Sequence, residues 1–399
     1  MSLNAVTSAE RLHISFFGCR NAGKSSVVNA VTGQELAVVS DVRGTTTDPV
    51  GKAMELLPLG PVVITDTPGF DDVGELGGLR VRRTKQILNR TDIAVLVVDA
   101  SAGMNAFDRQ LTEIFQEKGI PYLTVFNKSD LLGAVPESGE HEIYVSAVSG
   151  YHIRELKEML GRLAPEGKDR RLVGDLLAGG DKVVLVCPID ESAPKGRLIL
   201  PQQQTVRDVL DSGAIALVTR ETELTATLDS LREPPRIVIT DSQALGVVGP
   251  IVPDEVPLTT FSILMARYKG FLKTAVAGIA AAGKLQDGDR ILMAEGCTHH
   301  RQCNDIGTVK IPRMLQAYCG RTLRFETCSG ADFPDDLSDY AMVIHCGACM
   351  NTDRDVQYRM RCAVDQGVPF TNYGITLARV TGTLERSLRV FPDIHGLLA

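Results

Sequence analysis

The sequence lacks a long apolar run, an excess of basic residues and an apolar leader segment. No stretch reaches the roughly 18 consecutive apolar residues of a membrane-spanning helix, so we expect no membrane association. The 42 Lys and Arg residues are outnumbered by 49 Asp and Glu residues. Nucleic-acid-binding proteins usually show the opposite balance, so the composition favours no nucleic-acid partner. Glu10 and Arg11 lie where a secretory signal needs an apolar core, and we therefore expect a cytoplasmic protein.

Cysteine is nearly missing from the first three quarters of the chain. Only Cys19 and Cys187 precede Cys297, whereas seven of the nine cysteines lie between Cys297 and Cys362. In a reducing cytosol, thiols are more often free, catalytic or metal-bound than paired in disulfides. The clustering predicts one part of the chain with its own sulfur chemistry.

Short Val- and Ile-rich runs alternate with helical patterns along the whole chain. Such runs are typical of parallel sheets covered by helices on both faces, so we predict an α/β fold. A polar segment at 164–171 and a proline-containing segment at 247–258 are candidate boundaries. We therefore expect three domains, at 1–170, 171–265 and 266–399. The runs expected to form strands are 13–18, 61–66, 93–100, 121–127 and 142–147 in the first domain, KVVLVCPI, AIALVT and RIVIT in the second, and 290–295, 321–327, 340–346 and 368–372 in the third.

The segment GCRNAGKS, residues 18–25, fits the pattern G-x-x-x-x-G-K-[ST] and lies between an apolar run and a helical pattern. Backbone N–H groups of such a loop surround phosphates, and Lys24 adds a positive charge. The hydroxyl of Ser25 is expected to bind Mg²⁺. The residues assigned to this phosphate site are Gly18, Asn21, Ala22, Gly23, Lys24, Ser25 and Ser26.

Two later segments indicate that the base is guanine. NKSD follows an apolar run and resembles the guanine-reading motif of GTPases, in which Asn127 would support the loop. The Asp130 carboxylate would accept hydrogen bonds from the guanine N1–H and 2-amino groups, and adenine has neither donor in that arrangement. SAVSG resembles the loop whose backbone approaches the guanine oxygen. The residues assigned to base binding are Asn127, Lys128, Asp130, Ser146 and Ala147.

The segments DTPG and RGTTTDP complete the set of nucleotide motifs. Asp66 would hold Mg²⁺ through water, and the N–H of Gly69 would face the γ-phosphate. The second segment supplies a threonine that closes over Mg²⁺. Resemblance to Era/TrmE-like GTPases, with their GTT element, favours Thr46 over Thr45 or Thr47. The residues expected at the centre of GTP hydrolysis are Lys24, Thr46, Asp66 and Gly69.

Phe70 stands where Ras-like proteins carry a glutamine that positions the attacking water. A phenyl ring cannot orient water, so another group must act. In Era/TrmE-like GTPases of the G-x-x-N-x-G-K-S type, the asparagine, here Asn21, helps to bind a potassium ion beside the phosphates. This resemblance implies slow, potassium-stimulated hydrolysis.

Histidines and cysteines lie at the ends of two of the predicted strands in the third domain. Cys297 and His299 form a C-x-H segment, and His345, Cys346 and Cys349 form an H-C-x-x-C segment. Two cysteines at this spacing can direct both sulfurs toward one metal. Three thiolates with a variable fourth position can hold a 4Fe–4S cluster with one exchangeable iron, whereas four fixed ligands suit structural zinc. The remaining cysteines of this part, expected to be buried thiols, are Cys303, which is also a reserve ligand, Cys319, Cys328 and Cys362.

Joined to the GTPase motifs, this pattern resembles the FeFe-hydrogenase maturation GTPases of the HydF family over the whole chain. The resemblance implies an Era/TrmE-like GTP-binding domain at 1–170, a dimerisation domain at 171–265 and a cluster-binding domain at 266–399. The cluster ligands that it implies are Cys297, Cys346 and Cys349, with His299 or His345 as candidates for the fourth position.

The same resemblance implies a scaffold and carrier. The protein would receive a di-iron H-cluster precursor from two radical-SAM maturases and deliver it to the FeFe-hydrogenase apoprotein. It would use GTP, Mg²⁺ and K⁺ and work as a homodimer or a larger assembly.

Two alternatives stay open. An RNA- or ribosome-associated GTPase with a structural metal domain is one, because Era/TrmE-like domains commonly serve there. Residues 270–399 contain 14 basic and 14 acidic residues and so show no bias toward phosphate contacts. The other is a GTPase whose C-terminal part is held by zinc and is purely structural.

Overall fold

The computed structural model of the protein describes residues 11–33, 50–67, 87–164, 170–189, 198–296, 305–330 and 332–396. The chain forms two compact units, Met1–Lys168 and Asp169–Ala399, which we call the N-terminal unit and the C-terminal unit.

The described part of the N-terminal unit contains a six-stranded sheet in the order β2-β3-β1-β4-β5-β6. Neighbouring strands are parallel except for β2, which is antiparallel to β3. The strands are β1 (Leu12–Phe17), β2 (Val50–Leu56), β3 (Gly60–Asp66), β4 (Ile93–Asp99), β5 (Tyr122–Asn127) and β6 (Glu142–Tyr144). The helices are α1 (Lys24–Thr32), α3 (Ala106–Glu117), the 3-10 helix η2 (Ser129–Leu131) and α4 (Ile153–Leu163).

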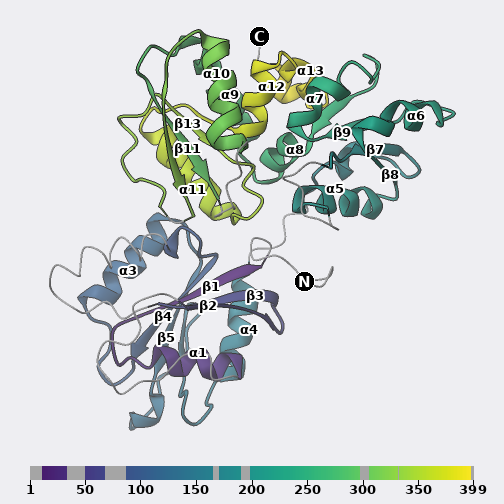
Figure 1. Ribbon diagram of the computed structural model, residues 1–399. Helices are drawn as coiled ribbons and strands as arrows, with labels where there is room; N and C mark the ends of the chain where they lie inside the picture. The colour runs from purple at the N-terminus through teal and green to yellow at the C-terminus, as the bar shows by residue number, and fades with distance from the viewer. Residues whose placement is uncertain are drawn as a thin grey trace. The chain divides into compact units, whose positions relative to one another are not determined.

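Helices cover both faces of this sheet, as Figure 1 shows. On one face, Val31 of α1 and Leu156 of α4 belong to the same core as Val95 of β4. On the other face, Phe115 of α3 packs in a second core with Leu96. Consecutive residues of β4 thus enter opposite cores, which explains why its sequence has no polar alternation.

The strand β2 has no continuous apolar run in its sequence, VGKAMEL. It forms a hairpin with β3, in which Val50 pairs with Asp66 and Leu56 pairs with Gly60. Gly60 has a φ of 79°, a left-handed conformation that glycine adopts without steric cost. Because β2 lies at the edge of the sheet, its polar side chains stay exposed, and sequence patterning gives little signal for it.

The described part of the C-terminal unit contains two four-stranded sheets, in the orders β10-β9-β7-β8 and β12-β11-β13-β14. All the strand pairs in both sheets are parallel. The strands are β7 (Lys182–Val186), β8 (Ile215–Thr219), β9 (Ile237–Thr240), β10 (Leu258–Thr260), β11 (Arg290–Glu295), β12 (Arg324–Ser329), β13 (Met342–His345) and β14 (Phe370–Asn372).

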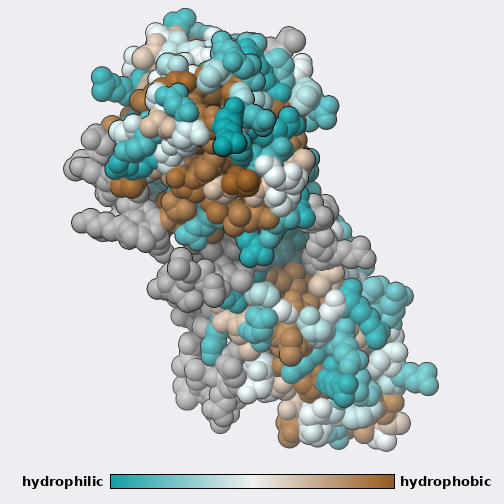
Figure 2. All heavy atoms as spheres, turned by 90° about the vertical axis from the view of Figure 1, so that its right-hand side faces the viewer, coloured by the Kyte–Doolittle hydropathy of each residue, from teal (hydrophilic) through white to brown (hydrophobic). Residues whose placement is uncertain are grey.

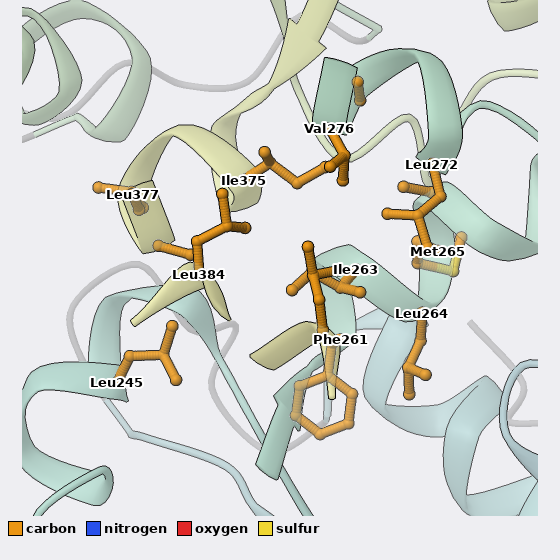
Figure 3. Close-up of a cluster of buried hydrophobic side chains, with 14 of the residues drawn as sticks. Leu245, Phe261, Ile263, Leu264, Met265, Leu272, Val276, Ile375, Leu377 and Leu384 are labelled. Carbon is orange, nitrogen blue, oxygen red and sulfur yellow. The ribbon is translucent and has the colours of Figure 1, made fainter. Parts of the chain in front are cut away.

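One buried core extends through both sheets of the C-terminal unit. Helices from the parts of the unit before and after residue 270 meet in this core. Figure 3 shows Leu245, Ile263, Val276, Ile375 and Leu384 directed toward one another. The residues before and after position 270 therefore fold against each other. The α-helices are α5 (Leu200–Asp211), α6 (Leu224–Asp229), α7 (Leu245–Val248), α8 (Phe261–Tyr268), α9 (Leu272–Ile279), α10 (Ile311–Cys319), α11 (Asp353–Asp365), α12 (Tyr373–Val380), α13 (Leu384–Leu388) and α14 (Pro392–His395). Shorter turns are η3 (Gly174–Leu176), η4 (Glu221–Glu223), η5 (Ser242–Ala244), η6 (Ala280–Lys284) and the π-helical η7 (Ile306–Lys310).

The predicted α/β fold with parallel sheets is confirmed, and its topology places the motif residues. In the N-terminal unit, β3 ends at Asp66 and β5 ends at Asn127. In the C-terminal unit, the neighbouring strands β11 and β13 end at Glu295 and His345. Because ligands bind beyond the carboxyl ends of parallel strands, these two edges are the candidate sites.

The strand β8 lies at the edge of its sheet and has no buried residue. Its Ile215 and Val218 side chains are 48% and 49% exposed. Figure 2 also shows apolar residues gathered on one face of the C-terminal unit. A sheet edge with exposed apolar side chains is a typical contact surface for another chain.

Candidate functional site

The phosphate loop connects β1 to α1 and depends on two glycines. A Cβ atom at Gly18, where φ is 147°, would lie 2.2 Å from the Val97 carbonyl oxygen. A Cβ atom at Gly23, where φ is 82°, would lie 2.2 Å from Asn127 Nδ2. Asn21 also has a positive φ, 63°, and is exposed. The loop conformation therefore requires glycine at both positions, as the motif predicts.

Asn127 joins three of the predicted motifs. Its buried Nδ2 donates a hydrogen bond to the Ala22 carbonyl oxygen at 3.1 Å. The backbone N–H of Ala147 donates to Asn127 Oδ1, also at 3.1 Å. One side chain thus holds the phosphate loop, the NKSD segment and the SAVSG segment together, which is the supporting role expected for it.

Lys24, Ser25 and Asp66 form one polar group at the carboxyl ends of β1 and β3. The Ser25 hydroxyl donates to Asp66 Oδ2 at 2.6 Å, and Lys24 Nζ lies 3.7 Å from Asp66 Oδ1. Lys24 is buried despite its charge, and the carboxylate beside it balances that charge. Carboxylate and hydroxyl oxygens are the ligands that Mg²⁺ prefers.

The residues predicted to bind the base lie at the end of β5 and in the loop after β6. Lys128 Nζ contacts Asp99 Oδ2 at 2.6 Å. Burial acts to raise the pKa of Asp99, but hydrogen bonds from Lys128 and Ser101 outweigh it and lower the pKa to about 2. Asp130 is exposed, whereas Ser146 is buried. The Asp130 carboxylate is therefore accessible to a ligand.

The structure adds two residues that the motifs do not include. Asn105, at the start of α3, donates from Nδ2 to Cys19 Sγ at 3.2 Å, and Cys19 Sγ lies 3.7 Å from Asp108 Oδ1. Burial raises the pKa of Asp108, and bonds from Asn105 and Cys19 oppose that rise. The spacing of Asn105 and Asp108 is that of a capping box. This pattern predicts the start of the helix from the sequence, but it does not predict the contact with Cys19 of the phosphate loop.

The other nucleotide residues divide into two groups. Ser26 is half-buried in the first turn of α1. Those outside the described residues are Thr45, Thr46, Thr47, Gly69 and Phe70.

In the C-terminal unit, the end of β11 is joined to the second cysteine segment by one hydrogen bond. The backbone N–H of Gly296, directly before Cys297 in the sequence, donates to Cys346 Sγ at 3.1 Å. The N–H of Ala348 also points to this sulfur. Burial raises the pKa of the Cys346 thiol, and both N–H donors oppose the rise. Such donors stabilise the thiolate form that binds metals.

The loop between Cys346 and Cys349 has an unusual conformation. Ala348 has a φ of 57° and is fully buried, although alanine rarely adopts the left-handed region. Burial raises the pKa of Cys349 to about 11. Backbone strain of this kind is found preferentially at functional sites, and the two half-buried thiols of the loop are sulfur donors of the type that iron–sulfur clusters and zinc use.

Gly296 and Asn351 are in close contact beside this loop. A Cβ atom at Gly296 would lie 1.7 Å from Asn351 Oδ1. That oxygen is buried and has no hydrogen-bond partner among the described residues. Over the same residues, no group of three or more His, Cys, Asp or Glu side chains could hold a metal ion. Two members of the predicted pattern, Cys297 and His299, lie outside them, as does the reserve ligand Cys303.

His345 is fully buried, and both of its ring nitrogens are engaged. Nε2 lies 3.1 Å from Arg359 Nη1, and Nδ1 lies 2.9 Å from the Cys346 carbonyl oxygen. A guanidinium only donates, so Nε2 accepts and Nδ1 carries the proton. Burial, followed by the charge of Arg359, lowers the pKa of His345 to about 4. The neutral ring holds the loop in this arrangement, and a metal bond from it would require the Arg359 contact to break.

The other cysteines of this part that the structure describes are free thiols at half-buried positions, namely Cys319 at the end of α10, Cys328 on β12 and Cys362 on α11.

Among the helices in the described ranges, none is long and apolar enough to cross a membrane.

Three family models match successive parts of the chain. Residues 13–128 match a model described as "50S ribosome-binding GTPase". Residues 172–270 match "Hydrogen maturase F dimerization domain", and residues 273–390 match "Hydrogen maturase F tetramerization domain".

Individual relatives resemble only part of the chain. The GTPase Der of Kosmotoga olearia is 33% identical over 187 residues, which cover 42% of this chain and 42% of that protein. The tRNA modification GTPase MnmE of a Synechococcus strain is 35% identical over 162 residues, which cover 39% of this chain and 34% of that protein. The chain thus spans less than half the length of these curated relatives.

A solved structure of Era from Aquifex aeolicus, bound to GDP and AlF₄⁻, is 19% identical with a TM-score of 0.35. The match covers 60% of this chain and 99% of that one. The matched GTPase domain supports binding of GTP or GDP with Mg²⁺ and hydrolysis of GTP. The two domain models after it support oligomerisation.

Proposed function

The chain belongs to the hydrogen maturase F family, and from this premise we propose that it is a GTP-hydrolysing scaffold for FeFe-hydrogenase maturation. It binds a 4Fe–4S cluster, receives a di-iron H-cluster precursor and delivers that precursor to the apo-hydrogenase. The observation that carries the proposal is the hydrogen bond from Gly296, the last described residue before Cys297, to Cys346 Sγ.

The nucleotide part of the proposal assigns a role to each motif residue. Lys24 and the loop N–H groups hold the phosphates, and Ser25, Thr46 and Asp66 hold Mg²⁺. The N–H of Gly69 meets the γ-phosphate. Replacing Lys24 by Ala is expected to abolish hydrolysis and leave the iron content unchanged. The exposed Lys52 of β2, replaced by Ala, is the matched control.

Hydrolysis is proposed to be slow and stimulated by K⁺ through Asn21. The support is the exposed, left-handed Asn21 within the phosphate loop, combined with Phe70 in place of a water-positioning glutamine. We expect faster turnover in KCl than in NaCl, and Asn21→Ala should remove the difference. Equal rates in the two salts would contradict this part.

The cluster part assigns Cys297, Cys346 and Cys349 as ligands, with His299 or His345 as candidates for the fourth position. The N–H donors around Cys346 support thiolate formation there. Three thiolates leave one iron of the cluster open to exchange, so a weakly held di-iron unit can bridge to it.

The three domains are proposed at 1–170, 171–265 and 266–399, with the GTP site in the first, dimerisation in the second and the cluster in the third. The exposed Ile215 and Val218 of the edge strand β8 support a homodimer contact in the second domain. The two radical-SAM maturases and the hydrogenase are the proposed partners, and the cytoplasm is the proposed compartment.

The decisive experiment replaces Cys297, Cys346 or Cys349 by Ala and measures iron content and activation of apo-hydrogenase after anaerobic reconstitution. We expect loss of both in each variant. Cys319→Ala changes a half-buried thiol away from the loop and is the control. Retained activation in all three variants would falsify the carrier function.

The alternative is an RNA- or ribosome-associated GTPase with a structural metal domain. The match of residues 13–128 to a model described as a ribosome-binding GTPase favours it. Salt-sensitive RNA binding by the purified protein, combined with zinc rather than iron in metal analysis, would support it over the carrier.

A further inference from the structure

Two buried cations outside every sequence motif lie beside the loop 345–349. Arg359 of α11 is 1% exposed, and Lys269, which follows α8, is 2% exposed. A charge is rarely buried to this extent unless nearby groups compensate for its lost hydration. The groups around each cation therefore indicate its role.

Arg359 uses all five of its N–H donors. Nη1 lies 3.1 Å from His345 Nε2 and 3.4 Å from the Glu295 carbonyl oxygen, and Nη2 lies 2.5 Å from the Gly330 carbonyl oxygen. Nε and Nη2 contact the Asp355 carboxylate at 3.4 and 3.1 Å. His345, Glu295 and Gly330 stand at the carboxyl ends of β13, β11 and β12. The guanidinium thus lies at the carboxyl ends of these three strands, next to the residue that precedes Cys346.

Lys269 supports the other end of the loop. Its Nζ donates to the Asn351 carbonyl oxygen at 3.0 Å, two residues after Cys349. It also contacts Asp353 Oδ1 at 2.9 Å, and Arg170 binds the second oxygen of that carboxylate at 2.8 Å. The two cations therefore approach the loop from both of its ends.

Both cations are fixed next to the residues that flank the two sulfur atoms. Arg359 contacts the ring of His345, directly before Cys346, and Lys269 contacts the carbonyl oxygen of Asn351, two residues after Cys349. Asp353 and Asp355 are the counter-charges of the two cations.

We propose that Arg359 and Lys269 are positioning residues whose fixed charges raise the reduction potential of an iron–sulfur cluster held by Cys346 and Cys349. This inference rests on the proposed function, because it requires the cluster. Reduction adds one electron to a site that already carries thiolate charge. A nearby buried cation favours the more negative, reduced form, since interior charges are weakly screened.

The test compares near-isosteric variants with controls on neighbouring helices. Lys269→Met removes one cation, and Lys273→Met on α9 removes an exposed one. Arg359→Gln removes the other, and Arg361→Gln changes an exposed residue two positions along α11. Each full-length protein is reconstituted anaerobically, and the midpoint potential is measured by a redox titration followed by electron paramagnetic resonance. Iron content is determined in parallel.

We expect both buried-cation variants to shift the midpoint potential to more negative values and both controls to keep the wild-type value. Lys269→Arg, which retains the charge, should also keep it. Asp353→Asn removes a counter-charge at a 41% exposed side chain and should shift the potential in the positive direction. This variant decides the question if Lys269→Met or Arg359→Gln fails to hold iron.

Unchanged potentials in Lys269→Met, Arg359→Gln and Asp353→Asn, with a full cluster in the wild type, would overturn this inference alone. A wild-type protein that takes up no iron–sulfur cluster would instead refute the proposed function. The two failures are therefore distinguishable in one series of samples.

Discussion

Asn127 Nδ2 lies 3.1 Å from the carbonyl oxygen of Ala22, although the two residues are 105 positions apart in the chain. The contact ties the base-binding end of β5 to the phosphate loop after β1. A second bond from the Ala147 N–H to the same side chain adds the loop after β6. One amide therefore connects three loops of the predicted nucleotide site.

Replacing Asn127 by Ala should weaken GTP binding more than it destabilises the N-terminal unit. The change removes the donor that holds the phosphate loop at Ala22, so the loop must be ordered when the nucleotide binds, at a cost of about 1–3 kcal/mol. We expect an increase in the dissociation constant of roughly tenfold to a hundredfold, measured by titration with a fluorescent GDP analogue. Thr112→Ala, on the exposed side of α3, is the control. Unchanged affinity would show that the bond does not shape the loop.

Most of the fold could be predicted from the sequence because its central strands are continuously apolar. The run 290–295 coincides with β11, and the run 93–100 differs from β4 by one residue. The strands β2 and β10 gave no such signal. β2 is an edge strand with polar residues, and β10 has only three residues, Leu258–Thr260.

Those parts of the candidate sites that belong to short sequence motifs could be predicted, whereas contacts outside the motifs could not. The contact between Asn127 and Ala22 follows from the motif order, whereas the contact between Asn105 and Cys19 bridges 86 residues with no pattern to mark it. The burial of Arg359 and Lys269 could not be predicted either, because the sequence does not distinguish a buried arginine or lysine from an exposed one. Only packing shows that Arg359 faces His345.

The edge strand β8 provides the next prediction. Ile215→Asp places a charge on its exposed apolar surface and should shift the protein toward smaller assemblies if β8 contacts a second copy. Size-exclusion chromatography with light scattering measures the change. Leu57→Asp adds a charge at an equally apolar position, 77% exposed, in the N-terminal unit and serves as control. An unchanged mass for Ile215→Asp would exclude β8 from the interface.

The Asp175–Arg267 ion pair should stabilise the C-terminal unit in a pH-dependent way. Arg267 Nη2 lies 2.5 Å from Asp175 Oδ2, and its bonds lower the pKa of this carboxyl. A folded pKa below the unfolded value gives stability that is present at neutral pH and is lost as the pH falls through the folded pKa. Both side chains are partly exposed, so Asp175→Asn should cost only about 0.5–1 kcal/mol at pH 7.

Thermal unfolding of wild type and Asp175→Asn across pH 7 to pH 3 measures this effect. The difference between the two melting temperatures should shrink toward the acid end of the range. Asp339→Asn is the control, because its carboxylate also pairs with an arginine but is 77% exposed. A difference that grows as the pH falls would contradict the assignment.

Gly296, beside the cysteine loop, and Gly347, within it, offer the sharpest comparison. In Gly296→Ala, the new Cβ atom would lie 1.7 Å from Asn351 Oδ1, so either Asn351 or the backbone that precedes Cys297 must move. In Gly347→Ala, the new atom meets nothing within 4 Å, although Gly347 lies between the two cysteines of the loop. Crowding of this kind typically costs about 1–3 kcal/mol.

We therefore expect Gly296→Ala to lose most of its iron after anaerobic reconstitution, while Gly347→Ala keeps the wild-type content. Melting temperatures of the iron-free proteins separate a local effect from general unfolding. If only the contact with Cys346 is displaced, the melting temperature of Gly296→Ala should fall only slightly. Since the N–H of Gly296 donates to Cys346 Sγ, a shift at this glycine alters the sulfur nearest to it. Equal iron in the two variants would mean that the cysteine site tolerates movement at the join between β11 and its loop, and that this join does not set the position of the ligands.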